Sequence, residues 1–348
     1  MTLDPYGLSR VVGQPGVLPQ RAERLDPSLP IRDGELLVDV DSLNVDAASF
    51  KQIKDEAGGD PAKIVETILR IVRARGKMQN PVTGSGGMLI GRVREIGRGH
   101  PAAGTLKPGD RIATLVSLTL TPLQIDEVKA VHPAIDRVDV RGHAILFASG
   151  IHARLPEDMP DTLALAALDV CGAPALVARF VKPGMAVAVL GAGKSGALCL
   201  AQARQQLGGG GKLIALDISK RALETLQGIG LCDAALEVNA TAAVEVMERV
   251  SQATGGKLCD LVVNCASVPG TEMATILSAR DGGTAIFFSM ATSFSAAALG
   301  AEGVGKDVTM IVGNGYAPGH ADLTLALLRS NPQLRRLFEE KYARASGS

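Results

Sequence analysis

The second half of the chain alternates short apolar runs with longer segments rich in helix-forming residues. A short apolar run without polar alternation is typical of a strand that is buried on both faces of a parallel sheet. Such runs alternate with helical segments from about Leu163 onward, which predicts a doubly wound α/β sheet. The predicted strands are residues 186–190, 212–217, 260–265 and 284–289.

The first half has a different pattern, in which apolar and polar positions alternate and glycines separate the strands. Residues 30–50 contain a turn at Asp33-Gly34 followed by alternating apolar positions. Residues 84–97 and 106–123 are predicted as further strands broken by glycine-containing turns. Short strands of this kind predict a compact β-barrel.

One helix is predicted inside this β-rich half, over residues 60–76. Asp60 is suited to cap it, Pro61 fits its first turn and Gly76 ends it. Its apolar positions recur near the helical period, which predicts a helix packed on one face. These positions are Ile64, Ile68, Ile71 and Val72.

The change of pattern, in a chain of 348 residues, predicts two domains. We expect residues 1–160 to form the β-rich domain and residues 161–311 to form the doubly wound domain. We expect the segment from about 312 to 348 to complete the first of these domains.

The turn after the first strand of the second domain carries the pattern Gly191-x-Gly193-x-x-Gly196. In a dinucleotide-binding turn these glycines permit the tight turn, the approach of the pyrophosphate and close helix packing, respectively. Lys194-Ser195 also suggests a triphosphate-binding loop, but that loop needs a glycine five positions before Gly-Lys-Ser, and an alanine stands there. The spacing therefore favours a dinucleotide at the helix N-terminus, with Lys194 and Ser195 beside it.

An acidic residue closes the next apolar run. Asp217 follows Gly196 by about 20 residues, where a carboxylate can accept hydrogen bonds from the adenosine ribose. It would repel the additional phosphate of NADP, so NAD is the favoured cofactor. Lys220 and Arg221 leave NADP as a weaker alternative.

Composition narrows the class of function. The chain is 46% hydrophobic and 21% charged, its formal net charge is zero, and it has no basic stripe interleaved with aromatic residues. These features argue against nucleic acid or an anionic membrane as the main partner. We expect a cytoplasmic protein, because no signal-like N-terminus or membrane-length apolar run is present. The five cysteines are expected to be small buried residues in a reducing compartment.

Several motifs together resemble the medium-chain dehydrogenase/reductase superfamily. They are the β-rich first half, "LKPGDRI" at 106–112, the glycine fingerprint after "VKPGMAVAVL", and "DLVVNCAS" at a later strand. The resemblance implies a GroES-like β-barrel domain that is joined to a Rossmann domain. It also implies a substrate cleft between the domains and a homodimer formed through the nucleotide-binding domain.

Further segments resemble one branch of this superfamily, whose members oxidatively deaminate a diamino acid with NAD. They are "GVLPQ", "GKMQNPVTGSGGMLIG", "ATLVSLTLTPL", "ALDVCGAPA", "FFSMATSF" and "ALGAEGVGKD". The resemblance therefore implies a small diamino acid as substrate and ammonia as a product.

The chain departs from the zinc-dependent relatives at the positions of their metal ligands. Gly84-Ser85-Gly86 replaces their Gly-His-Glu, Asp46 stands near their cysteine ligand, and Cys171 lacks partners. Because zinc sites need three or four ligands, we expect no metal. A base and an ordered water suffice to deprotonate an ammonium and hydrolyse the resulting iminium.

The resemblance to these relatives also implies candidate catalytic residues. Asp46 is the candidate base, although a helix-capping aspartate is an equal alternative, and Asn44 is expected to orient the substrate or the nicotinamide. Ser85 could position the attacking water or could simply belong to a turn. Asp169 is a candidate for the distal ammonium or a helix cap. Lys77 is the first candidate for the substrate carboxylate, with Lys306 as the alternative.

The cofactor site is expected to include the loop after the last strand that the pattern predicts. Ser289 and Thr292 lie there, where backbone groups commonly meet the nicotinamide carboxamide. Two rival functions remain open at this point. One is a zinc-free quinone or enone reductase that uses NADPH, and the other is a dinucleotide-binding protein without catalytic activity.

Overall fold

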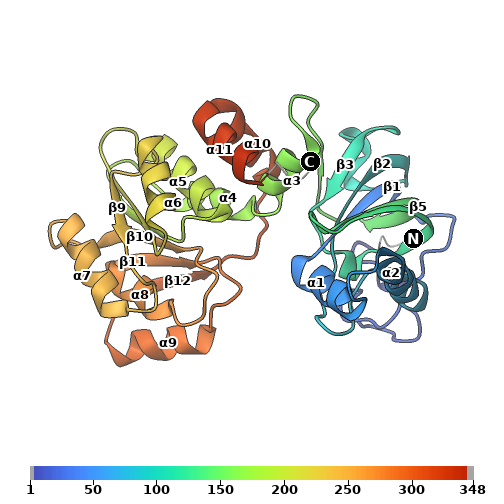
Figure 1. The fold of residues 1–348 in the computed structure, drawn as a ribbon, viewed down its shortest axis with the longest axis horizontal. Coiled ribbons are helices and arrows are strands. Elements are labelled where there is room, and N and C mark those ends of the chain that lie inside the picture. Colours follow the sequence, from blue (N-terminus) through green and yellow to red (C-terminus); the bar gives the residue numbers. More distant parts are fainter. Residues whose placement is uncertain (1–3, 343–348) are drawn as a thin grey trace. The chain divides into compact units, whose positions relative to one another are not determined.

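The computed structural model describes residues 4–342, which divide into two compact units between Asp161 and Thr162. Figure 1 draws the chain from the N-terminal to the C-terminal end. Each unit has its own sheet and its own buried core, so the two are described separately.

The first unit is built on a six-stranded antiparallel sheet in the order β4-β5-β1-β2-β3-β6. Its strands are β1 (Glu35–Val45), β2 (Gly87–Ile96), β3 (Arg111–Thr114), β4 (Leu123–His132), β5 (Arg137–Phe147) and β6 (His152–Arg154). Its helices are α1 (Ala47–Glu56) and α2 (Pro61–Arg75), with short 3-10 turns at η1 (Leu8–Arg10), η2 (Pro101–Gly104) and η3 (Leu118–Leu120). The inward faces of the strands and helices share one apolar core.

The predicted helix is confirmed as α2. The Asp60 side chain accepts a hydrogen bond from the Ala62 amide, and Gly76 ends the helix with a φ of 61°. Glycine suits this left-handed position, because a Cβ there is strained. The four predicted apolar positions are buried, as an amphipathic helix on a core requires.

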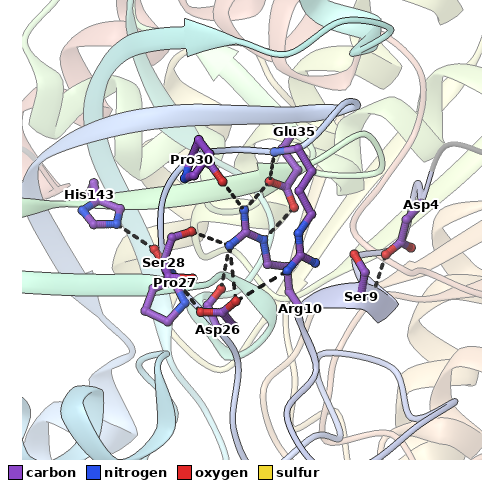
Figure 2. A network of polar contacts seen from close by, with 10 residues as sticks. Asp4, Ser9, Arg10, Asp26, Pro27, Ser28, Pro30, Glu35 and His143 are labelled. Atoms are coloured by element: carbon purple, nitrogen blue, oxygen red, sulfur yellow. Dashed lines mark hydrogen bonds and ion pairs between the residues drawn. The ribbon is translucent and has the colours of Figure 1, made fainter. Parts of the chain in front are cut away.

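The N-terminal segment is fastened to the first sheet by a buried arginine (Figure 2). Arg10 donates through Nε and Nη2 to the two carboxylate oxygens of Glu35, at 2.8 and 2.6 Å. Its Nη1 donates to the carbonyl of Ser28 at 2.5 Å, and Asp26 lies 3.7 Å away as a second carboxylate. Only 1% of the Arg10 side chain is exposed, so the network compensates for the burial of its charge.

The second unit is built on a six-stranded parallel sheet in the order β12-β11-β10-β7-β8-β9. This is the Rossmann order, in which the order of the strands reverses between β7 and β10 while all strands stay parallel. The strands are β7 (Ala186–Leu190), β8 (Lys212–Asp217), β9 (Ala234–Glu237), β10 (Cys259–Asn264), β11 (Ala279–Phe287) and β12 (Val308–Val312).

Helices cover both faces of this sheet (Figure 1). The helices α5 (Lys194–Leu207) and α6 (Lys220–Gly228) lie on one face, and α7 (Ala243–Ala253), α8 (Glu272–Ser278) and α9 (Phe294–Gly303) lie on the other. The unit begins with α3 (Asp161–Leu168) and α4 (Gly172–Phe180). A sheet covered on both faces has strands that are apolar throughout, and β7 and β8 match the predicted ranges.

The C-terminal helices correct one expectation. The helices α10 (His320–Ser330) and α11 (Pro332–Tyr342) belong to the second unit rather than completing the first. They pack against α4 and α5, and the Thr324 hydroxyl donates to the Cys171 carbonyl at 3.3 Å. The apolar face of these helices, including Leu325, Leu328 and Phe338, is buried in this position.

Two further sequence expectations concern cysteines and membrane spans. Four of the five cysteines are buried and Cys265 is half-buried, all as free thiols. Within residues 4–342, no single helix has the length and apolar character to cross a membrane. The bent pair α3 and α4 passes that test by length and composition only.

Candidate active site

The glycine fingerprint forms the turn between β7 and α5 as the sequence predicts. Gly191 has a φ of 97°, and a Cβ there would lie 2.9 Å from the Ala266 amide nitrogen. A Cβ on Gly196 would lie 1.7 Å from the Gly191 carbonyl oxygen, so this position accepts only glycine. A Cβ on Gly193 would meet nothing within 4 Å. The first and third glycines therefore serve packing, and the second leaves open space.

The start of α5 is suited to an anion. Among the described residues, no side chain caps this helix, and Gly193 at its N-cap is exposed. The first amides of a helix lack intrahelical partners and carry the positive end of the helix dipole. With the open space at Gly193, this end of α5 fits the pyrophosphate of a dinucleotide.

Asp217 ends β8 and links two turns. Its Oδ2 accepts a hydrogen bond from the Ala192 amide at 2.6 Å, and its Oδ1 accepts one from the Ser219 amide at 2.7 Å. These contacts fix the carboxylate at the carboxyl end of the sheet, beside the fingerprint. This is the position at which Rossmann proteins bind an adenosine ribose.

A cavity of about 500 Å³ opens next to this carboxylate. One wall comes from the fingerprint turn and α6, and the other comes from the C-terminal helix α11. The lining residues are Ala192, Ala197, Ser219, Arg221, Ala222, Thr225, Leu226, Leu337, Glu340 and Lys341. The cavity therefore has both apolar and polar lining residues, which suit an adenosine moiety. One of its walls is α11, a segment that was expected to complete the first domain.

The loop after β11 carries Ser289 and Thr292, as predicted for the nicotinamide end. The Ser289 amide donates to the Asn264 carbonyl at 3.2 Å, and its hydroxyl accepts from the Ala291 amide at 3.2 Å. The Thr292 hydroxyl is buried without a partner among the described residues. A buried hydroxyl of this kind is suited to a ligand, because an unpaired polar group is costly.

Asn264 organises this edge of the sheet and was missed by the sequence analysis. It is fully buried at the end of β10, where its Nδ2 donates to the hydroxyls of Thr271 (2.8 Å) and Thr275 (2.9 Å). Its Oδ1 accepts from the Ala266 amide at 3.0 Å. Asn264 thus holds the loop after β10 through its side chain and the loop after β11 through its carbonyl. Its sequence signal was its place in "DLVVNCAS", as a polar residue closing an apolar run.

Lys194 and Asp169 were predicted separately, for the pyrophosphate and for the distal ammonium. In the structure they form an ion pair, with 2.7 Å between Lys194 Nζ and Asp169 Oδ2. Lys194 is the first residue of α5, and Asp169 lies in the connection between α3 and α4. The pair places an acidic side chain directly beside the fingerprint turn.

In the first unit, Asp46 and Ser85 lie together, as the predicted site requires. The Ser85 hydroxyl donates to Asp46 Oδ1 at 3.1 Å, and the same carboxylate oxygen accepts from the Ala48 amide at 3.1 Å. Asp46 therefore caps α1, which was the alternative interpretation, while its exposed carboxylate still carries the contact with Ser85.

Two hydroxyl groups that the sequence analysis did not single out continue this contact. The buried Ser49 hydroxyl lies 2.6 Å from the Ser85 hydroxyl and 2.6 Å from the hydroxyl of Thr83, which is exposed. A chain of hydrogen bonds thus runs from Asp46 through Ser85 and Ser49 to Thr83. No motif marks Ser49, since its role depends on the fold of α1 against the 76–91 segment.

A second carboxylate lies near Asp46. The Asp136 carbonyl accepts the Val45 amide at 2.9 Å, and Asp136 has a φ of 52° in the turn between β4 and β5. Burial raises the pKa of Asp136, and repulsion from the Asp46 carboxylate raises it further. The Lys54 ammonium lowers the same pKa. A second carboxylate and the Lys54 ammonium therefore both lie near Asp46.

Asn44 lies on β1 beside Met88 of β2 and Arg137 of β5. Its Oδ1 is buried without a partner among the described residues. This leaves a hydrogen-bond acceptor two residues before Asp46, which agrees with a role in orienting a ligand.

The structure corrects the assignment of Lys77. Its side chain is fully buried, and its ammonium donates to the carbonyls of Pro19 (2.7 Å) and Gln20 (3.4 Å). Burial, with a smaller contribution from Arg75, lowers the pKa of Lys77 to about 8. Lys77 therefore fastens the N-terminal segment and does not present a charge to a substrate carboxylate. Lys306, the alternative, lies 3.8 Å from Asp281.

Within residues 4–342, no group of three or more His, Cys, Asp or Glu side chains is arranged to hold a metal ion. Burial raises the pKa of the Cys171 thiol to about 12, so Cys171 is a neutral thiol at physiological pH.

Comparison with known proteins agrees with this geometry. The profile described as the L-erythro-3,5-diaminohexanoate dehydrogenase N-terminal domain matches residues 9–156. The L-erythro-3,5-diaminohexanoate dehydrogenase of Acetoanaerobium sticklandii is 53% identical over 97% of this chain and 98% of its own length. The enzyme of the same name from Fusobacterium nucleatum has the same identity and coverage.

Solved structures show the fold of a wider group. An alcohol dehydrogenase from Thermotoga maritima is 19% identical and superposes with a TM-score of 0.55 over 90% of this chain and 88% of its own. The GroES-like and Rossmann architecture is thereby confirmed. From its similarity to full-length relatives, the chain belongs to the L-erythro-3,5-diaminohexanoate dehydrogenase family and is an oxidoreductase.

Proposed function

We propose that this protein catalyses the NAD-dependent oxidative deamination of L-erythro-3,5-diaminohexanoate to 5-amino-3-oxohexanoate and ammonia. The observation that carries the proposal is the 53% identity, over nearly the whole of both chains, to dehydrogenases named for this substrate. The neighbouring carboxylates of Asp46 and Asp136 support it, because the substrate carries ammonium groups.

NAD is the proposed cofactor rather than NADP. Asp217 supports this choice, because the Ala192 and Ser219 amides fix its carboxylate at the end of β8, where Rossmann proteins bind the ribose. A fixed negative charge there favours ribose hydroxyls and disfavours a ribose phosphate. When bound, NAD supplies the acceptor for the hydride that leaves carbon 3 of the substrate.

The proposed chemistry needs a base and a water molecule. The ammonium on carbon 3 loses a proton to Asp46, hydride leaves the same carbon, and water adds to the resulting iminium and releases ammonia. We assign Ser85 to orient this water and Asn44 to accept a hydrogen bond from the substrate or the nicotinamide. Overall, the substrate ammonium group, NAD and water react to give a ketone, an ammonium ion, NADH and one proton.

We further propose that zinc takes no part in this reaction. Support comes from the residues at the positions of the relatives' ligands, since Ser85 and Asp46 are hydrogen-bonded to each other. A serine hydroxyl is a poor zinc ligand compared with the imidazole it replaces.

A homodimer is proposed through the second unit. The strand β12 is the outer strand of its sheet, and its Met310 and Val312 are exposed. Phe294 and Leu299 of α9 are exposed as well, at 53% and 68%. An open, apolar strand edge is suited to pairing with a second copy. Light scattering of the wild type and of a Met310→Lys variant tests this, with a dimer expected only for the wild type.

The activity is tested by mixing the protein with NAD and L-erythro-3,5-diaminohexanoate in chelator-treated buffer. We expect reduced-nicotinamide absorbance to rise and ammonia to be released in equal amount. Loss of turnover in the chelator, restored by zinc, would contradict the metal-free chemistry. Absence of turnover with NAD still bound would reject the substrate, and turnover of an enone with NADPH would favour the reductase alternative.

A further inference from the structure

Two free cysteines of the second unit meet beside the fingerprint turn. The Sγ atoms of Cys199 and Cys265 lie 3.9 Å apart, although the two residues are 66 positions apart in the chain. Cys199 lies on α5 and is fully buried, whereas Cys265 directly follows β10 and is half-buried. Both residues belong to the second unit, so the contact forms within one compact fold.

The two thiols differ in how a reagent can reach them. Burial raises the pKa of the Cys199 thiol, and its contact with Cys265 raises that pKa further. Cys199 is therefore a protonated thiol that is shielded from solvent. Oxidation of cysteine depends on exposure, so the half-buried Cys265 is the thiol that a small oxidant reaches first.

We propose that Cys199 and Cys265 form a redox modification site, at which a peroxide creates a reversible disulfide that weakens dinucleotide binding. In the first step the Cys265 sulfur attacks hydrogen peroxide, the O–O bond breaks, and a sulfenic acid and water form. In the second step the Cys199 sulfur displaces hydroxide from the Cys265 sulfur, and the thiol proton leaves with the hydroxide as water. Each sulfur loses one electron, and the peroxide is reduced to two water molecules. A dithiol reductant reverses the oxidation by exchange.

The disulfide acts on the fingerprint turn because Cys265 is bonded to it. The Cys265 amide donates to the Leu190 carbonyl at 2.8 Å. A Cβ on Gly191 would lie 2.9 Å from the Cys265 carbonyl carbon, so the turn is packed against the Cys265 backbone without spare room. A disulfide requires the sulfurs to approach to about 2 Å, which draws Cys265 toward α5 and shifts the turn. The effect on the dinucleotide rests on the proposed function, in which NAD binds at this turn.

The disulfide itself is tested without any cofactor. The wild type is treated with a small molar excess of hydrogen peroxide and digested without reductant. Mass spectrometry should find the peptides of Cys199 and Cys265 joined, and two of the five free thiols should be lost. Dithiothreitol should restore both thiols, whereas it does not reverse the oxidation of methionine. Absence of the joined peptides in the wild type overturns the proposal.

Three single variants assign the bond. Neither Cys199→Ala nor Cys265→Ala should form the joined peptides, and Cys265→Ala keeps the test open if Cys199→Ala does not fold. Cys232→Ala is the matched control, because Cys232 is a buried free cysteine outside this pair, and it should form the disulfide as the wild type does. Joined peptides in Cys265→Ala would assign the bond to another cysteine and overturn the proposal.

The affinity for NAD provides the second readout. Calorimetry before and after peroxide treatment should show that the Kd for NAD rises about tenfold in the wild type and in Cys232→Ala. Dithiothreitol should restore the original Kd, and the Kd of Cys265→Ala should not respond to peroxide. An unchanged Kd in wild-type protein that carries the disulfide overturns the effect on the dinucleotide. If the reduced wild type does not bind NAD, the proposed cofactor fails, while mass spectrometry still decides the disulfide.

Discussion

The Ser85 hydroxyl donates a hydrogen bond to the Asp46 carboxylate, with 3.1 Å between Oγ and Oδ1. The two residues stand 39 positions apart, one at the N-cap of α1 and one just before β2. Their contact joins the helix cap to the hydroxyl chain of Ser49 and Thr83. Asp46 therefore combines a structural role with the proposed catalytic one, and a test of catalysis has to preserve the cap.

Asp46→Asn separates these roles, because asparagine caps a helix as well as aspartate does. We expect the melting temperature and the Kd for NAD to stay near the wild-type values. The kcat should fall by about 10² to 10⁴, as for loss of a general base. Steady-state kinetics measures this, and a kcat within about twofold of wild type would leave Asp46 as a cap only.

Gly193→Ala and Gly196→Ala form a matched pair in the fingerprint. A Cβ at position 196 meets the Gly191 carbonyl at 1.7 Å, so Gly196→Ala should unfold at markedly lower denaturant concentration. Gly193 has open space around it, so Gly193→Ala should fold normally and bind NAD weakly. Urea unfolding and calorimetry read the two effects, and equal stability of both variants would argue against the role assigned to Gly196.

Asp217→Asn tests the cofactor preference. Loss of the charge should weaken NAD binding about tenfold, as for a hydrogen bond to a charged group. It should strengthen NADP binding, because the repulsion of the ribose phosphate is removed. The ratio of the two dissociation constants, from fluorescence titration, is the measurement, and an unchanged ratio would remove Asp217 from the specificity argument.

Lys77 gives the stability of the first unit a pH dependence. Its pKa falls from 10.5 to about 8 on folding, so below pH 8 the ammonium is charged in both states and its burial is unfavourable. Between about pH 8 and 10.5 the unfolded chain holds a proton that the folded protein has released. Stability contributed by this group therefore rises with pH in that window.

Lys77→Met should lack this rise when the free energies of unfolding of the two proteins are compared from pH 7 to pH 10.5. The KM for the substrate should not change, because Lys77 is buried against the Pro19 and Gln20 carbonyls. A large increase in KM would restore the earlier assignment to the substrate carboxylate.

Arg10→Met should destabilise the first unit by about 3–5 kcal/mol, because it leaves Glu35 buried without its partner. Double substitution of Arg10→Met and Glu35→Leu should cost less than the sum of the single substitutions. Urea unfolding of the four proteins gives the coupling, and additive effects would show that the contacts in Figure 2 contribute independently.

The second unit was the more predictable part of the fold. The strands β7 and β8 are buried on both faces, so their sequences are continuous apolar runs with clear ends. The outer strands β9 and β12 were not predicted, and they are only partly buried. In the first unit, β4 has one solvent-facing side, and the sequence pattern there is correspondingly weaker.

Residues whose roles depend on distant partners were the hardest to predict. The fingerprint glycines act within one turn, so their spacing was sufficient. Lys77 was assigned by its charge, but its ammonium is used by carbonyls almost 60 positions earlier. Asn264 and Ser49 carry no charge, and only the packing around them reveals their hydrogen bonds.

The packing of α10 and α11 on the second unit makes the protein divisible. Within residues 4–342, the chain passes from one unit to the other once, at Asp161–Thr162. Each described unit is therefore a contiguous stretch of polypeptide with its own core. A gene divided at this junction would encode two fragments, each of which contains one described unit. We expect on this basis that the nucleotide-binding half folds when it is produced alone, so that it can be labelled or exchanged between relatives as a separate piece.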